Sequence, residues 1–144
     1  MSNELRHKTT PASRTKPITV EIAPGELIDK ITILEIKNER IADAAKLRNV
    51  RVELETLCAA RDQAMEKSDD LTRLTAELKT VNEALWEIED DIRDCERQRD
   101  FGPRFIELAR SVYHQNDRRA AVKRQINELL GSKLIEEKSY TNYN

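Results

Sequence analysis

With 144 residues, the chain is long enough for one compact domain or one elongated helical element and too short for two full domains. Charged residues make up 36% of it and aromatic residues only 4%, which is too polar for the thick core of an ordinary globular protein. With only three glycines and an abundance of Ala, Glu, Lys, Leu and Arg, the composition excludes a β-sandwich, a barrel and a glycine-dependent nucleotide fold, and it predicts an all-α protein.

The charges nearly cancel, because 25 basic and 27 acidic residues leave a formal net charge of −2. No global attraction to nucleic acid or to an anionic membrane surface is therefore expected. No apolar run approaches the roughly 18 residues needed to span a bilayer, and the first residues lack the apolar segment of a signal peptide. We predict a cytoplasmic protein without a nucleic-acid partner or a membrane span. Cys58 and Cys95 lack the spacing of zinc ligands and are expected to be buried thiols.

The N-terminal residues 1–17 are rich in basic residues, Ser, Thr and Pro and show no periodicity, which predicts a disordered basic tail. An arm that binds phosphates is the alternative interpretation of the same charges. In residues 18–24, isoleucine and valine alternate with polar residues, which indicates a short extended segment. One short strand cannot form a sheet alone, so this segment must pair with a partner or lie against helices.

From Glu26 onward, apolar residues recur at alternating steps of three and four, which predicts a helix over about residues 25–66. Two apolar seams run side by side along its first part, so it should be covered from two sides. Ser68 can cap a second helix over about residues 69–100, in which a heptad pattern typical of coiled coils runs unbroken from Leu71 to Cys95. These two helices are expected to form an antiparallel hairpin.

A third helix is predicted over about residues 103–130, with Pro103 in its first turn and Gly131 just past its end. The predicted fold is thus a three-helix, coiled-coil-like bundle over residues 25–131. Residues 132–144 hold enough apolar surface to dock on this bundle but not to fold alone.

The first predicted helix is longer than the second and should project beyond it at Glu26–Ile36, where apolar residues surround much of its circumference. A lone helix cannot leave such a surface exposed, so we predict a homodimer formed through this helix. The extended segment folded back over it could provide the same cover. A break in the helix, for instance near Asn49, with a more compact four-helix arrangement, is a further alternative.

Polar residues on the predicted seams form a cluster in the middle of the bundle. A satisfied buried network that sets the register of the helices is one interpretation. The other is a pocket in which basic and amide groups bind an anionic or sugar-like ligand, with acidic groups as hydroxyl acceptors or metal ligands. The candidate ligand-binding residues are Glu89, Asp90, Arg93, Asn116, Asp117, Arg119 and Lys123.

An enzymatic alternative depends on two ExxD pairs, Glu26/Asp29 and Glu87/Asp90, which place carboxylates on one helix face as magnesium ligands require. The pattern is similar to that of all-helical nucleoside triphosphate pyrophosphatases, but their preceding EExxE motif is absent. The hypothesis is a metal-dependent hydrolase or transferase of phosphorylated small molecules. It would use Asp29, Glu89, Asp90 and Asp117. No nucleophile, metal site or cofactor is assigned from the sequence.

Five segments carry a resemblance to a known family: GELIDKITILEIK at 25–37, VNEALWEIED at 81–90, NDRRA at 116–120, KRQIN at 123–127 and EEKSY at 136–140. Together they resemble the bacterial uncharacterised family 6165, a domain of unknown function, over about Ile18 to Tyr143. The resemblance implies a small helical bacterial protein associated with cell-surface polysaccharide or glycosyltransferase systems, and it provides no catalytic residue.

Three functions follow as hypotheses from the cluster and the resemblance. The first is a dimeric binding or adaptor module with a site for an anionic or sugar-nucleotide-like ligand. The resemblance implies that this module has a protein partner in cell-surface polysaccharide synthesis. The second is the metal-dependent enzyme. The third is a purely structural coiled-coil adaptor.

Overall fold

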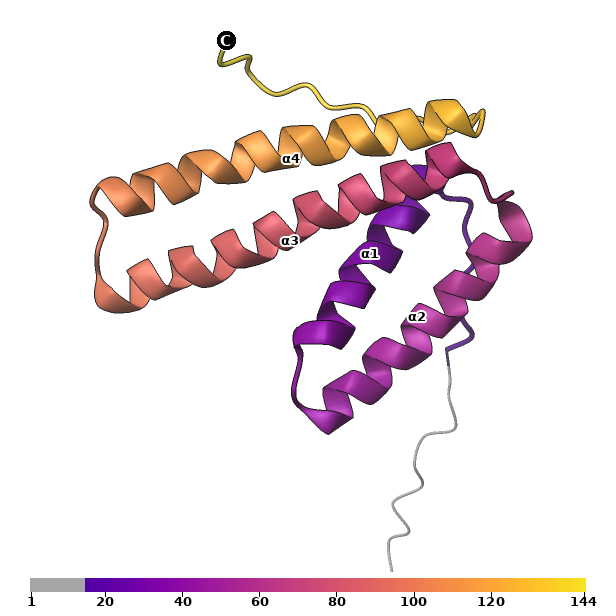
Figure 1. The fold of residues 1–144 in the computed structure, drawn as a ribbon, viewed down its shortest axis with the longest axis horizontal. Coiled ribbons are helices and arrows are strands. Elements are labelled where there is room, and N and C mark those ends of the chain that lie inside the picture. Colours follow the sequence, from indigo (N-terminus) through magenta and orange to yellow (C-terminus); the bar gives the residue numbers. More distant parts are fainter. Residues whose placement is uncertain (1–14) are drawn as a thin grey trace, which may run out of the picture.

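The computed structural model describes residues 15–144, which contain four α-helices and no strand (Figure 1). The helices are α1 (Pro24–Arg40), α2 (Ala44–Ala64), α3 (Asp69–Gln98) and α4 (Pro103–Leu129). The all-α class expected from composition and periodicity is confirmed, whereas the prediction of three helices is wrong. Residues 1–14 of the predicted basic tail lie outside the described residues.

The helix predicted over residues 25–66 is divided at Ile41–Asp43. Ile41 adopts an extended conformation (φ −78°, ψ 132°), and the Asp43 side chain accepts a hydrogen bond of 2.9 Å from the backbone N–H of Lys46. An aspartate in this position satisfies an amide at the start of a new helix, so Asp43 is the N-cap of α2. The break lies about two helical turns before Asn49. The four-helix alternative is therefore correct, with the break at a different place.

The other helix boundaries follow local signals in the sequence. Pro24 and Pro103 lie in the first turns of α1 and α4, where the missing proline N–H costs no hydrogen bond. The Ser68 hydroxyl accepts from the backbone N–H of Leu71 at 3.1 Å and caps α3. Gly131, with φ +64°, follows the end of α4 in the left-handed conformation that glycine adopts easily.

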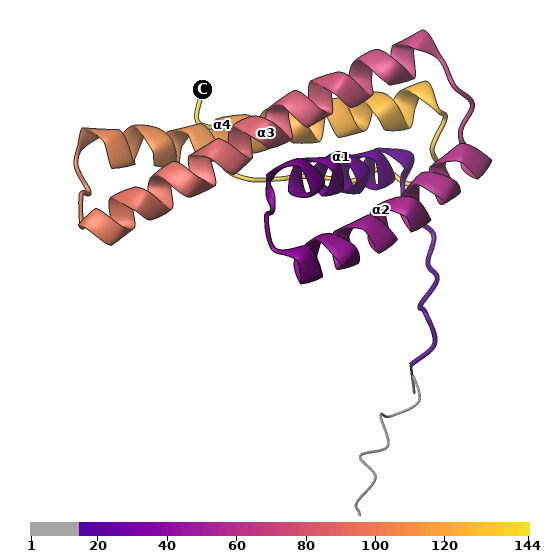
Figure 2. The same cartoon turned by 60° about the horizontal axis from the view of Figure 1, so that its bottom comes forward.

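The helices pack in a different order from the predicted one, because α2 contacts α1 but neither α3 nor α4, whereas α1 contacts all three other helices (Figure 1). The expected hairpin about Ser68 is therefore wrong. The chain instead forms two hairpins, α1–α2 and α3–α4, and α1 lies between α2 and the α3–α4 pair (Figure 2). The turn at Ile41–Asp43 directs α2 back along α1 and away from α3.

The α3–α4 hairpin is antiparallel about Gly102, as ion pairs across it show: Arg118 contacts Glu77 at 3.9 Å and Arg104 contacts Asp91 at 3.7 Å. Helix α1 crosses the half of this hairpin that is distant from Gly102, and the half near Gly102 projects beyond α1 and α2 (Figure 2). The main core lies at the crossing. It consists of Ile28, Leu71, Leu74, Leu78, Val122 and Ile126, with Met65 and Leu130 packed against it.

The apolar face of α1 is buried within a single chain. Its buried apolar side chains are Leu27, Ile28, Ile31, Leu34 and Ile36. The predicted overhang at Glu26–Ile36 is thus covered by the other helices, and the observation that suggested a homodimer is removed. The two thiols differ, since Cys95 is buried and Cys58 is partly exposed. No described helix has the length and apolar character that crossing a membrane would require.

Neither end of the described chain has regular secondary structure. In residues 15–23, the side chains of Ile18 and Val20 are exposed, so no helix covers them. Residues 132–144, which we call the tail, run back along α4: Glu136 contacts Lys123 and Tyr143 contacts Asp117. The tail thereby adds a second wall beside α4.

Candidate ligand-binding cleft

A close approach between α1 and α4 places the polar residues of the two helices opposite one another. The backbone N–H of Gly25, in the first turn of α1, donates a hydrogen bond of 2.7 Å to Oδ1 of Asn127. A Cβ atom at residue 25 would lie only 2.4 Å from the carbonyl oxygen of Lys123 and 2.9 Å from that same Oδ1 atom. Only glycine fits this contact, and it brings Glu26 and Asp29 against α4.

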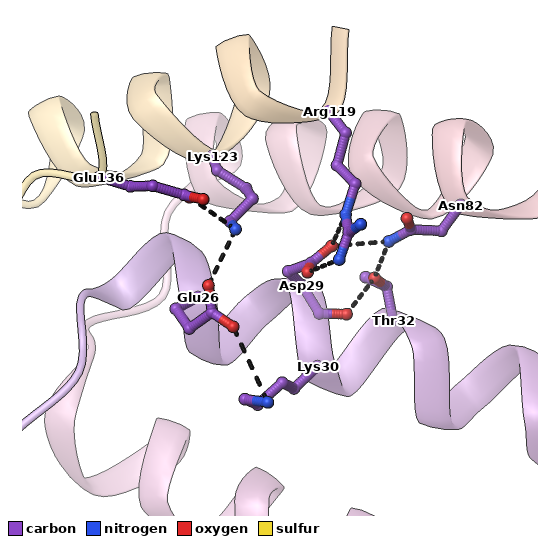
Figure 3. A network of polar contacts seen from close by, with 8 residues as sticks. All are labelled: Glu26, Asp29, Lys30, Thr32, Asn82, Arg119, Lys123 and Glu136. Atoms are coloured by element: carbon purple, nitrogen blue, oxygen red, sulfur yellow. Dashed lines mark hydrogen bonds and ion pairs between the residues drawn. The ribbon is translucent and has the colours of Figure 1, made fainter. Parts of the chain in front are cut away.

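The Asp29 carboxylate is the centre of a buried network (Figure 3). Its side chain is 1% exposed, and both of its oxygens accept hydrogen bonds from the guanidinium of Arg119, with 2.9 Å between Nε and Oδ1. Nδ2 of Asn82 on α3 donates to the same Oδ1 at 2.9 Å and to Oγ1 of Thr32 at 3.0 Å. The hydrogen bond to Asp29 raises the pKa of Arg119. This network joins α1 to both α3 and α4.

A second charged group, the ammonium of Lys123, lies beside this network (Figure 3). Its side chain is 9% exposed, and Nζ donates to a carboxylate oxygen of Glu26 at 2.8 Å and to one of Glu136 at 2.7 Å. Burial alone would lower the pKa of Lys123, but the hydrogen bonds to Glu136 and Glu26 outweigh it and raise the pKa. Lys123 is therefore a charged group held between α1 and the tail.

These groups line a cavity of about 700 Å³ between α4, the start of α1 and the tail, which we call the α4–tail cleft. It offers basic, acidic, amide and hydroxyl groups together. The lining residues are Glu26, Asn116, Arg119, Ala120, Lys123, Glu136, Glu137, Lys138, Ser139 and Tyr140. Such a lining suits a ligand that carries both negative charge and hydroxyl groups.

A second cavity, of about 760 Å³, adjoins the cleft under the end of the tail. We call it the aromatic pocket, because Tyr113 and Tyr143 line it with ring centroids 5.0 Å apart. Its Asp117 accepts hydrogen bonds from Nζ of Lys138 at 2.7 Å and from the Tyr143 hydroxyl at 2.8 Å. The Lys138 hydrogen bond, followed by that of Tyr143, lowers the pKa of Asp117. The aromatic pocket thus depends on the tail for one of its walls.

A third cavity, of about 360 Å³, lies between α1 and α3, and we call it the α1–α3 groove. Its lining combines apolar side chains with charged ones: Ile33, Ile36, Asn82, Leu85, Trp86, Glu89, Asp90, Arg93 and Arg119. Glu89 and Arg93 form an ion pair of 3.0 Å along α3, and both side chains are largely exposed. A surface pair of this kind is ordinary for a solvated helix face.

The predicted site residues therefore divide among three places. Asn116, Arg119 and Lys123 line the α4–tail cleft, and Asp117 lines the aromatic pocket. The three candidates on α3, Glu89, Asp90 and Arg93, lie in the α1–α3 groove, where Arg119 is the one residue shared with the cleft. The sequence prediction assumed a bundle of three long helices lying side by side, whereas α1 crosses α3 and α4.

Several residues of the cleft were not predicted as ligand groups. Glu26 was considered only as part of an ExxD pair, although it contacts Lys123. Glu136, Lys138 and Tyr140 belong to the tail, for which periodicity gives no position in space. The EEKSY segment at 136–140, which contains these three residues, was the signal that could have suggested them.

The ExxD pair on α1 has its carboxylates neutralised by cations, since Glu26 contacts Lys123 and Asp29 binds Arg119. Among residues 15–144, no three His, Cys, Asp or Glu side chains gather in a way that could hold a metal ion. The acidic residues named for the enzymatic hypothesis lie in separate cavities or in the Asp29 network. The fold therefore does not bring the acidic residues of the enzymatic hypothesis together in one site.

Comparison with known proteins identifies one protein family, described as "Family of unknown function (DUF6165)", which matches residues 18–143. This range contains all four helices and nearly the whole tail. No curated protein and no solved structure matches the chain significantly.

Proposed function

Because the chain belongs to the DUF6165 family, whose function is unknown, we propose from the geometry of the α4–tail cleft that it is a non-catalytic binding module. Its ligand is an anionic small molecule with hydroxyl groups, and a sugar nucleotide is the class that fits best. The observation that carries this proposal is the Lys123 ammonium, which is almost fully buried and already holds an anionic oxygen of Glu136 at 2.7 Å.

The Glu136 carboxylate occupies the position that a ligand phosphate would take. It is supplied by the tail, a segment without helix or strand, and its side chain is 55% exposed. Glu26, in contrast, belongs to α1, so its contact with Lys123 does not depend on the tail. A phosphate can therefore replace Glu136 on Lys123 and keep the buried cation satisfied by a charge-assisted hydrogen bond.

The remaining polar groups of the cleft suit the rest of such a ligand. Lys138 can neutralise a second negative charge, as it already does for Asp117. The Asn116 amide and the hydroxyls of Ser139 and Tyr140 can exchange hydrogen bonds with sugar hydroxyls. Arg119 stays with Asp29, so it supplies positive potential at the edge of the cleft while it holds α1 in place.

A purely structural adaptor is the second candidate function, and a specific observation favours it. Arg119 and Lys123 are both paired with acidic side chains of the same chain, so the cleft requires no ligand to be electrostatically satisfied. In this case the polar groups only hold α1 and the tail on α4. A protein partner in cell-surface polysaccharide synthesis stays a prediction from the family resemblance, as does the cytoplasmic location.

The two functions are separated by isothermal titration calorimetry of the full chain with inorganic pyrophosphate and with UDP-glucose. For a binding module, we expect saturable binding of UDP-glucose that weakens with salt and becomes about tenfold weaker in Lys138→Ala. Lys46→Ala, an exposed lysine on α2 distant from the cleft, is the matched control and should bind as the wild type does.

Glu136→Gln provides a result that a packing role does not predict. It removes the carboxylate that competes for Lys123, so anions should bind more tightly than to the wild type. No heat of binding with any anion, or equal affinities for wild type, Lys138→Ala and Glu136→Gln, would overturn the binding proposal and leave the structural adaptor.

A further inference from the structure

The α4–tail cleft and the aromatic pocket are neighbouring parts of one surface between α4 and the tail. Asn116, Lys138 and Tyr140 line both of them, so a single ligand can extend from one into the other. Along α4, ten residues separate Tyr113 in the pocket from Lys123 in the cleft, which corresponds to about 15 Å. This is close to the length of an extended nucleoside diphosphate.

The aromatic pocket has the chemistry of a site for a planar ring. Val112, Tyr113 and Tyr143 supply apolar and aromatic surface, and the Tyr113 side chain is 40% exposed despite its contacts with the other rings. Around this surface lie hydrogen-bonding groups with both donors and acceptors: Asn116, Asp117, Thr141, Asn142 and Asn144. Aromatic faces bind bases by stacking, and amide groups can pair with the edge of a base.

The two cavities differ in the basic groups that they offer to a phosphate. The cleft contains Arg119 and Lys123, both absent from the lining of the aromatic pocket, and it also contains the carboxylates of Glu26, Glu136 and Glu137. Lys138 lies at the boundary, because it lines both cavities. A phosphate that replaces Glu136 on Lys123 therefore fits the Lys123 end and a ring fits the Tyr113 end, with Lys138 between them.

We infer that the aromatic pocket is the base subsite of the same ligand site, so that the ligand is a nucleoside diphosphate or its sugar conjugate. Its base lies against Tyr113, and its phosphates extend past Lys138 toward Lys123. This inference depends on the proposed function, because it assigns an orientation and a ring to the anionic ligand of the α4–tail cleft.

A simpler role for the same aromatic groups is to hold the tail. The rings of Tyr113, His114 and Tyr143 lie with centroids 4.8 to 5.0 Å apart, and Tyr143 also binds Asp117 through its hydroxyl. If this is their entire role, loss of an aromatic ring affects all ligands alike through the position of the tail. The experiment therefore compares ligands with and without a base.

The test is calorimetric titration of the full chain with pyrophosphate, uridine and UDP. We expect UDP to bind about tenfold more tightly than pyrophosphate, since stacking of the base adds to the phosphate contacts. Tyr113→Leu keeps apolar volume and removes the ring face. This variant should bind UDP about tenfold more weakly than the wild type does, and its affinity for pyrophosphate should stay within about twofold of the wild-type value. Phe105→Leu, the same type of change on α4 outside the pocket, is the matched control.

The outcomes distinguish this inference from the proposed function. Equal affinities for pyrophosphate and UDP in the wild type would overturn the base subsite and leave the anion site intact. If Tyr113→Leu lowers the affinities for pyrophosphate and UDP by the same factor, the ring only positions the tail. This result would also overturn the base subsite. Absence of binding by any of these ligands would overturn the proposed function itself.

Discussion

Arg119 on α4 binds both carboxylate oxygens of Asp29 on α1, ninety residues away in the sequence. The two partners are unequally buried, since the side chain of Asp29 is 1% exposed and that of Arg119 is 30% exposed. The pair connects the crossing helix α1 to the hairpin that provides the candidate site. Loss of this ion pair should therefore lower the stability of the fold, whatever its effect on ligand binding.

Arg119→Ala is expected to lower the free energy of unfolding by about 3 kcal/mol, because it leaves a buried carboxylate without its cation. Asp29→Asn should cost less, about 1–2 kcal/mol, since the freed guanidinium can reach solvent. Urea denaturation followed by circular dichroism measures both changes. Arg93→Ala removes an exposed pair within α3 and should cost less than about 0.5 kcal/mol. Equal effects at Arg93 and Arg119 would contradict the network.

Gly25→Ala is expected to destabilise the protein by about 2 kcal/mol, because its Cβ would overlap the carbonyl oxygen of Lys123 and force α1 away from α4. Thermal unfolding detects the change. Gly102→Ala is the control, because its Cβ would meet only the end of the Asp100 side chain at 3.2 Å, and it should cost less than about 1 kcal/mol. A tolerated alanine at residue 25 would show that the two helices do not approach so closely.

Ile31→Ala tests whether the apolar face of α1 is the core of one chain or an interface between two. Ile31 is fully buried within the chain, so we expect a loss of about 3 kcal/mol in unfolding free energy. The unfolding midpoint should not depend on protein concentration, as it would for an obligate dimer. Val52→Ala, at an exposed site on α2, should change stability by less than about 0.5 kcal/mol. A midpoint that rises with concentration would restore the dimer hypothesis.

The attachment of the tail should depend on pH through Asp117. Hydrogen bonds from Lys138 and Tyr143, with the charge of nearby His114, hold the pKa of Asp117 below its ordinary value of 3.8. The contact therefore contributes fully above about pH 3.8 and is lost as the pH falls through the lower value of the folded protein. The amide signals of residues 138–143 in heteronuclear NMR spectra would follow this loss.

The same contact should also weaken in alkali, because its hydrogen bond to Asp117 raises the pKa of Tyr143 from 10.0. A raised pKa means that the contribution is present below pH 10 and disappears as the pH rises through the folded value. Asp117→Asn is the control for the acid and the alkaline transition. It removes the acid transition, and it brings the pKa of Tyr143 back toward 10.0. Unchanged transitions in this variant would place their origin elsewhere.

Much of the local structure could be predicted from the sequence because its causes are local. Ser68 caps α3, Pro103 begins α4 and Gly131 follows its end, each through groups within a few residues. The break at Ile41–Asp43 also has a local cause, the Asp43 cap, but the apolar spacing on either side continues through it and suggested one helix.

Less of the candidate site could be predicted from the sequence, because its residues are brought together over long sequence distances. Asn116, Arg119 and Lys123 line one cavity, because they share one face of α4. Their partners Glu26, Asp29 and Glu136 come from α1 and the tail. No spacing rule relates these segments to α4, so the cluster was instead assigned to Glu89, Asp90 and Arg93 on the neighbouring α3.

By itself, the sequence determined the helical class, most of the helix ends and the membership in a family over residues 18–143. Composition, periodicity and caps act within a few turns of helix, so they can be recognised without knowledge of the rest of the chain. Only the tertiary structure decided that α1 crosses α3 and α4 instead of pairing with α3 as one long helix. This arrangement depends on the short turn at Ile41–Asp43, which ends α1, and on the close contact of Gly25 with α4. The same apolar seams could have packed in several other orders.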